Sequence, residues 1–401
     1  MASSATSPRA IPFATNGVAL LHLNFLLTGI VMTFLGPMLP MLAARWSITD
    51  AVSGRLYLTQ FISSMFGMLA SAPTVQRRGY RFTFIVGLIA MASGMALLAS
   101  GPFSRGIVAV AILGFGHGIT TPAGNLRTAD INPQRSASAL NLINAVWGLG
   151  AMTPPLLLKL VSELHHPTWF LYGTSAALTV LLIGFALAKF VPDEHSEAGV
   201  SQRTTLRIFS ILPVICALFF IYVGAETAFG GWVATHARRI GSGNGSWWEF
   251  APFFFYGSML VGRLTAPLAL RHRREIRVAE IGLTVALLGA VSLVVAHSVP
   301  LVICGAILAG LGLASIFPIS VSFFPAWFGE SSRLASGPIF ACGNMGGAVL
   351  PWLVGVVSTH SGSLRFALVV PLMSVVTMLS FYGVQDLRRK RVLVEVAPSS
   401  G

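Results

Sequence analysis

The sequence contains little charge: only 10% of its 401 residues are Asp, Glu, Lys or Arg, whereas 54% are hydrophobic. Soluble globular proteins carry about 25% charged residues, so this composition excludes that class. Runs of 18 or more mainly apolar residues recur along the chain, and each is long enough to cross ~30 Å of hydrocarbon as a helix. The short alternating segments of a membrane β-barrel are missing. The composition therefore predicts an all-α polytopic membrane protein.

Cysteine is also scarce. Cys216, Cys304 and Cys342 are scattered within apolar segments, which indicates neither a disulfide framework nor a metal site. No nucleophile–base constellation supports an enzyme, and the Gly-rich segments follow no strand that would make them a phosphate-binding loop. We therefore expect no catalytic residues, no metal and no cofactor. The first apolar run is followed by no cleavage-site pattern, so we interpret it as a retained helix.

The net charge of +13 first suggests a nucleic-acid partner. The basic residues lie in short loops between apolar runs, however, as a membrane topology requires. Eighteen of the 26 Lys and Arg residues fall on one set of loops, which includes both termini, and seven fall on the opposite set. The positive-inside rule then predicts a multi-pass inner-membrane protein with both termini in the cytoplasm. We expect the lipid bilayer as a partner and no nucleic acid.

Apolar runs bounded by charge, Gly and Pro predict twelve membrane spans. They cover residues 17–43, 53–74, 82–100, 105–126, 137–161, 168–190, 208–235, 247–270, 277–297, 299–325, 334–358 and 364–386. The longest polar connection lies near the middle of the chain, at residues 191–207. It predicts a cytoplasmic linker between an N-terminal six-helix half, 1–190, and a C-terminal six-helix half, 208–401.

Three internal matches support a duplication. "GFGHGITTP" aligns with "GLGLASIFP" at an offset of 196 residues, "GAMTP" with "GAVLP" at 197, and "GIVMTFLGP" with "GAETAFGGW" at 195. Each match alone is weak, but all three fall in corresponding spans at nearly one offset. Membrane transporters are often built from such repeats, with the substrate site between them near the midplane.

At this point the chain resembles the major facilitator superfamily over essentially its full length. The basic turns "QRRGYR" (76–81) and "RHRREIR" (271–277) occupy the places of its two signature cytoplasmic loops. The first turn departs from the family pattern, which carries an Asp where this chain has Thr74, Val75 and Gln76. This departure bears on the charge relay at that loop and not on the fold.

The resemblance narrows to the fucose permease-like branch of sugar symporters. It rests on "NLINAVWGLGAMTPPLL" (141–157), "YVGAETAFGGW" (222–232) and "ACGNMGGAVLPWLVGVVS" (341–358). It implies a twelve-helix monomer that works by alternating access. It also implies that spans 1, 4, 7 and 10 line a central cavity, flanked by spans 2, 5, 8 and 11.

Helical spacing places polar residues on shared faces of these spans. The candidates for substrate binding are Asn24, Thr28, Asn125, Asn141 and Asn144, together with the aromatic Trp147 and Trp232. Amides and hydroxyls suit an uncharged, hydroxyl-rich solute, and tryptophan faces stack on the apolar face of a sugar ring. The alternative is that the Asn and Thr side chains join neighbouring helices, and that the tryptophans anchor at the membrane interface.

Glu226 is the leading candidate for substrate binding and proton coupling. Its repeat counterpart is Val31, so the duplicated helix does not itself require a carboxylate. An acidic residue within a span is a functional hypothesis by default. Related proton symporters carry acidic residues in the middle of spans 1 and 4, where this chain has none. Proton coupling therefore depends on Glu226 alone, and sodium coupling and uniport stay open.

Four further charged residues are candidates for gating: Arg77, Arg78, Asp130 and Arg263. Arg263 lies one or two turns inside span 8, and we expect it to extend toward the cytoplasm or to brace the loop after that span. Anion binding is its alternative role. Asp130, at the cytoplasmic end of span 4 near Arg127, is expected to act in gating or helix capping.

Together these features predict a secondary active transporter for a small polar solute. A monosaccharide or related polyol, coupled to protons, fits the Asn-lined cavity. A drug or metabolite efflux antiporter of the same superfamily is the alternative.

Overall fold

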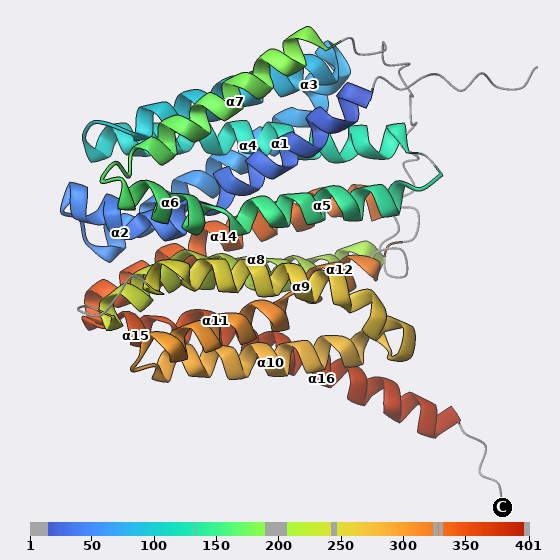
Figure 1. Cartoon of the computed structure of the whole chain (residues 1–401). Helices are drawn as coiled ribbons and strands as arrows, with labels where there is room; N and C mark the ends of the chain where they lie inside the picture. Colours follow the sequence, from blue (N-terminus) through green and yellow to red (C-terminus); the bar gives the residue numbers. More distant parts are fainter. Residues whose placement is uncertain are drawn as a thin grey trace, which may run out of the picture.

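The computed structural model describes residues 15–132, 134–188, 207–241, 247–323, 328 and 332–396, and every element in this part of the chain is helical (Figure 1). The elements up to residue 188 are α1 (Thr15–Thr33), α2 (Leu35–Trp46), α3 (Asp50–Leu98), α4 (Phe103–Ile131), α5 (Ser136–Met152), α6 (Pro154–Glu163) and α7 (Trp169–Leu187). The later elements are α8 (Arg207–Ile240), η1 (Trp247–Phe250), α9 (Ala251–His272), α10 (Glu275–Val295), α11 (Val299–Leu313), α12 (Ile316–Ser322), α14 (Ser332–Ser361), α15 (Leu364–Ala367) and α16 (Val369–Val396).

These helices confirm the polytopic membrane fold. Within the described residues, ten helices or joined helix pairs are long and apolar enough to span a membrane, and the bent pair α1–α2 makes an eleventh. Helix α3 is 49 residues long. At 1.5 Å per residue it is more than twice the thickness of the hydrocarbon core, so it contains two of the expected spans. The twelve spans of the sequence analysis are thereby accounted for.

Glycine and proline set the two main irregularities. Within α3 the chain turns at Gly79, whose φ of 79° and ψ of 168° are accessible to glycine at little cost. The turn falls inside the basic loop "QRRGYR". Helices α1 and α2 bend by 42°, because the ring of Pro37 cannot donate an N–H to the carbonyl of Thr33 and clashes with it.

Two close helix contacts recur at the spacing of the internal repeat. A Cβ added at Gly150 of α5 would collide with the carbonyl of Leu26 in α1. A Cβ added at Gly346 of α14 would collide in the same way with the carbonyl of Phe220 in α8. Small residues allow membrane helices to approach this closely. The recurrence supports duplication of the α1–α5 pair as the α8–α14 pair.

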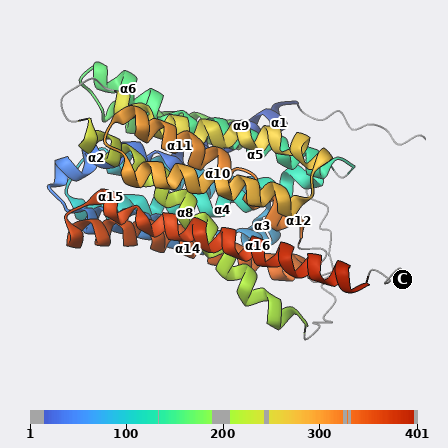
Figure 2. The ribbon, with the colours of Figure 1, turned by 90° about the horizontal axis from the view of Figure 1, so that it is seen from below.

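The long helices run between two ends of the molecule (Figures 1 and 2). The terminal end contains the start of α1, the turn within α3 and the end of α16, and the far end contains α2, α6 and α15. The predicted linker lies outside the described residues, apart from Arg207 at the start of α8. The division into two six-helix halves stays a prediction. Below, "first half" and "second half" mean the chain before and after that linker.

Candidate functional site

Glu226 forms an ion pair with Arg263 near the middle of their helices. The Nη2 atom of Arg263, in α9, lies 3.6 Å from Oε1 of Glu226, in α8. The side chain of Glu226 is 15% exposed and that of Arg263 is 26% exposed, so both remain partly accessible. Arg263 was expected to extend toward the loop after span 8 as a gating residue. The structure instead places its guanidinium against Glu226, because α8 and α9 pack together.

Two tyrosines complete this charged cluster, and the sequence analysis did not identify either. Tyr222 precedes Glu226 by one helical turn, and Tyr256 precedes Arg263 by two turns on α9. Both lie within electrostatic range of Glu226 and Arg263. The Tyr222 hydroxyl is buried beside Glu226 and Arg263 and interacts with both, and the Arg263 Nε is buried without a hydrogen-bond partner. The cluster therefore retains one unpartnered donor, the Arg263 Nε, and it also contains the Tyr222 hydroxyl and one carboxylate acceptor.

Three amide side chains of the first half also have unsatisfied polar atoms. Asn24 of α1 is fully buried, and neither its Oδ1 nor its Nδ2 has a partner. Asn125 of α4 has an unpartnered Oδ1. Gln60 of α3, which the sequence analysis missed, donates to the carbonyl of Val31 at 3.2 Å and leaves its Oε1 unpartnered. Buried polar atoms rarely stay unpaired without a functional reason or a bound molecule, so these residues are candidate ligands of a polar solute.

The remaining polar candidates differ in their surroundings. Thr28 is buried and donates to the carbonyl of Phe25 at 3.0 Å, which already satisfies its hydroxyl donor. Asn141 and Asn144 are exposed on α5, and Asn144 donates to the carbonyl of Leu140 at 2.7 Å. Trp147 is half-buried and packs against the core. Within the described residues, no hydrogen bond or ion pair joins these four residues to the Glu226–Arg263 pair.

Trp232 does not present a free face beside Glu226 in this conformation. Its side chain is completely buried, and its Nε1 donates to the carbonyl of Pro351 in α14 at 2.8 Å. Its ring also contacts Tyr57 at 6.4 Å between centroids. The placement of Trp232 is therefore that of a packing residue between helices, six residues along α8 from Glu226.

The loop residues expected to act as gates lie at the terminal end. Asp130 accepts a 2.6 Å hydrogen bond from the hydroxyl of Tyr80, and both residues belong to the first half. Arg77 and Arg78 are exposed, and the guanidinium of Arg78 lies over the ring of Phe82. These contacts lie within the first half and do not bridge the two halves.

The far end carries contacts that do join the halves. Asp50, at the start of α3, forms a 2.6 Å ion pair with Arg239 at the end of α8. Its second carboxylate oxygen accepts a 2.5 Å hydrogen bond from Ser358 of α14. We call Asp50, Arg239 and Ser358 the far-end latch. In the sequence, Arg239 is one of the seven basic residues on the opposite set of loops, and no pattern pointed to Asp50 or Ser358.

Glycines of the "YVGAETAFGGW" motif bring the halves together beside this latch. The Tyr57 hydroxyl donates to the carbonyl of Gly231 at 2.9 Å. A Cβ added at Gly36 of α2 would meet the backbone of Gly230. Nearer the middle, Asn344 of α14 donates to the sulfur of Met68 at 3.2 Å. Toward the terminal end the ribbons of α5 and α9 draw apart in Figure 1. The far end is thus closed in this conformation.

Comparison with known proteins agrees with this architecture. The family model described as Major Facilitator Superfamily matches residues 21–292. The glucose/mannose transporter GlcP of Bacillus subtilis (strain 168) is 22% identical over 348 residues, which cover 82% of this chain and 85% of that protein. Among solved structures, the nucleoside transporter NupG has a TM-score of 0.73 at 15% identity, over 92% of this chain and 98% of that one. The E. coli fucose:proton symporter FucP has a TM-score of 0.61 at 17% identity, over the same shares of the two chains. The family model confirms the superfamily, and FucP is among the solved structures that the chain resembles in fold.

Proposed function

Because this chain belongs to the major facilitator superfamily and its relatives are membrane transporters, we propose that it is a secondary transporter for a monosaccharide or related polyol. The observation that supports this most is the Glu226–Arg263 cluster, a partly exposed ion pair near the middle of two apolar spans. Charge in that position is costly to maintain and marks substrate or ion pathways in membrane proteins.

The chemistry of the polar atoms fits a hydroxyl-rich solute. Glu226 can accept hydrogen bonds from hydroxyl groups, while Arg263 and Tyr222 can donate to them. The unpaired amides of Asn24, Gln60 and Asn125 can do both. Two relatives are named for sugars, GlcP for glucose and mannose and FucP for fucose. These names and this donor–acceptor set together support the sugar class.

Coupling to protons would operate through the same ion pair. A carboxylate can take up and release a proton, and a protonated Glu226 loses its ionic attraction to Arg263. The freed guanidinium then becomes available to the solute or to Tyr222. Proton binding and solute binding would thus be linked at one place, which is the requirement for symport.

The conformation fits one state of an alternating-access cycle in which the two halves rock about a central site. The far-end latch is closed, and the excess of Lys and Arg lies toward the terminal end. By the positive-inside rule the terminal end faces the cytoplasm of an inner-membrane protein. In this proposal the structure is an inward-facing state of a monomer.

Uptake by proteoliposomes tests the proposal. The purified chain is reconstituted, and uptake of radiolabelled monosaccharides, polyols and nucleosides is measured with and without an inward proton gradient. We expect saturable uptake of a monosaccharide or polyol that rises with the gradient. Saturable sugar uptake that does not depend on the proton gradient would contradict proton symport, but it would still support the sugar class. Uptake of nucleosides alone, or uptake of none of these solutes, would contradict the sugar class, and the latter result would favour the efflux alternative.

A further inference from the structure

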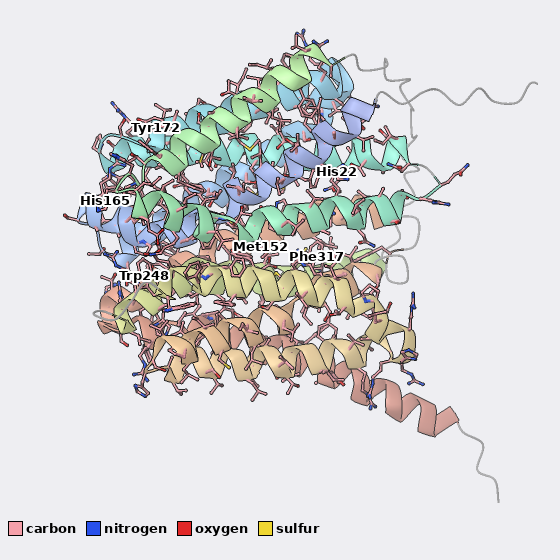
Figure 3. All side chains as sticks on the ribbon, in the orientation of Figure 1. His22, Met152, His165, Tyr172, Trp248 and Phe317 are labelled. Atoms are coloured by element: carbon pink, nitrogen blue, oxygen red, sulfur yellow. The ribbon has the colours of Figure 1, made fainter. Side chains whose placement is uncertain are left out.

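A cavity lies at the far end, where the two halves meet, away from the Glu226–Arg263 cluster. Its volume is about 590 Å³, within the range of small-molecule sites. We call it the seam cavity. It is lined from the first half by α2, Asp50 and Ser53, and from the second half by Thr235, Arg238, Arg239 and Trp248. Figure 3 shows Trp248 at this end of the molecule.

The charges around the seam cavity favour an anion. Both oxygens of Asp50 are already used, one by Arg239 and the other by Ser358. Arg238 is exposed and lies over the ring of Trp248 at 5.5 Å, and it forms no ion pair within the part of the chain described. Glu249 nearby is paired with Lys159 at 3.6 Å. Arg238 also lies within electrostatic range of Glu249, but it forms no direct ion pair with it, so the cavity offers one guanidinium that is still available to a ligand carboxylate.

The rest of the lining describes the body of the ligand. The side contributed by α2 is apolar, from Leu39 to Ala44, and the Trp248 ring forms part of the opposite side. Ser53 and Thr235 are 1% and 7% exposed, and their hydroxyls have no hydrogen-bond partner. A ligand oxygen placed between α3 and α8 would provide that partner, and an apolar body would cover α2.

We propose that the seam cavity binds a small organic anion with an apolar body, such as an aromatic or aliphatic carboxylate. The carboxylate pairs with Arg238, and the body packs on α2 and Trp248. Such a ligand touches both halves while the far end is closed, so it stabilises the closed arrangement. The site is separate from the proposed sugar site, and its occupancy is measurable without any transport.

Calorimetric titration of the full chain in lipid nanodiscs tests the site, with benzoate as probe and benzamide as its neutral match. We expect saturable binding of benzoate and much weaker binding of benzamide. Arg238→Gln should weaken benzoate binding by about tenfold or more, the effect of losing one charge-assisted hydrogen bond. Arg238→Lys should retain most of the binding, because it keeps the charge.

Arg105→Gln is the matched control, since Arg105 is an exposed arginine at the same end that does not line the cavity. It should leave benzoate binding unchanged. Three results would overturn the proposal: no benzoate binding, benzamide binding as tightly as benzoate, or equal binding by wild type and Arg238→Gln.

Discussion

At the scale of single residues, the proposed function depends on a carboxylate, Glu226, that has a cationic partner in Arg263. Glu226 could be identified from the sequence, because a charged residue within an apolar span stands out and its repeat counterpart is Val31. Its partner could not be identified, since the ion pair depends on how α8 and α9 cross. Tyr222 gave a usable signal in retrospect: it lies one turn before Glu226, on the same face of the helix.

The pairing predicts an asymmetry between single and double substitutions. Arg263→Gln leaves the Glu226 carboxylate in an apolar span without its cation, which is more costly than removing both charges. We expect this variant to melt at a lower temperature than wild type in a detergent-based thermal unfolding assay. The double variant Glu226→Gln/Arg263→Gln should recover part of that loss. A double variant no more stable than Arg263→Gln would show that the pair contributes nothing.

At the scale of helices, the apolar runs predicted the spans well, and the exceptions have local causes. The α1–α2 bend follows from proline chemistry, and the turn inside α3 follows from the positive φ of Gly79. Close packing was harder to predict. The specific neighbours of a glycine, such as the Phe220 carbonyl against Gly346, depend on tertiary structure.

A substitution at this contact tests the packing of α14 on α8. Gly346→Ala places a methyl group against the Phe220 carbonyl, so the helices must move apart. We expect a lower melting temperature and less folded protein by size-exclusion chromatography. Gly173→Ala in α7 is the control, because no atom lies within 4 Å of the added methyl group. This control should be neutral or slightly stabilising, since alanine is the better helix former by about 1 kcal/mol. Equal behaviour of the two variants would contradict the close contact.

At the scale of the whole molecule, the sequence predicted the family and a topology, but it could not predict which end is closed. The far-end latch joins Asp50 to Arg239 and Ser358, which lie 189 and 308 positions later in the chain. No local pattern connects positions so distant. The positive-inside rule assigns the loops to two sides of a membrane, but it does not say whether the halves touch on either side.

The far-end latch should control the balance between conformations in which the far end is closed and conformations in which it is open. Asp50→Asn removes the ion pair with Arg239. We therefore expect a larger population of molecules in which the two halves are separated at the far end. Pulsed electron–electron double resonance between spin labels at positions 47 and 361, in a cysteine-free background, would measure this separation. The charge swap Asp50→Arg/Arg239→Asp should restore the shorter distance.

Glu163→Gln serves as the control for this experiment, because the exposed Glu163 pairs with Lys159 one turn away within α6. It should leave the far-end distances unchanged. Distance distributions that are identical in wild type and Asp50→Asn would contradict the role of the latch.

The central claim is that Glu226 couples solute movement to protons, and one measurement tests it directly. Glu226→Gln would be reconstituted into proteoliposomes and compared with wild type for proton-driven accumulation and for solute counterflow, with the exposed Glu163→Gln as control. We predict that Glu226→Gln still exchanges solute but no longer accumulates it against a gradient, while the control behaves as wild type. Normal proton-driven accumulation by Glu226→Gln would contradict the claim.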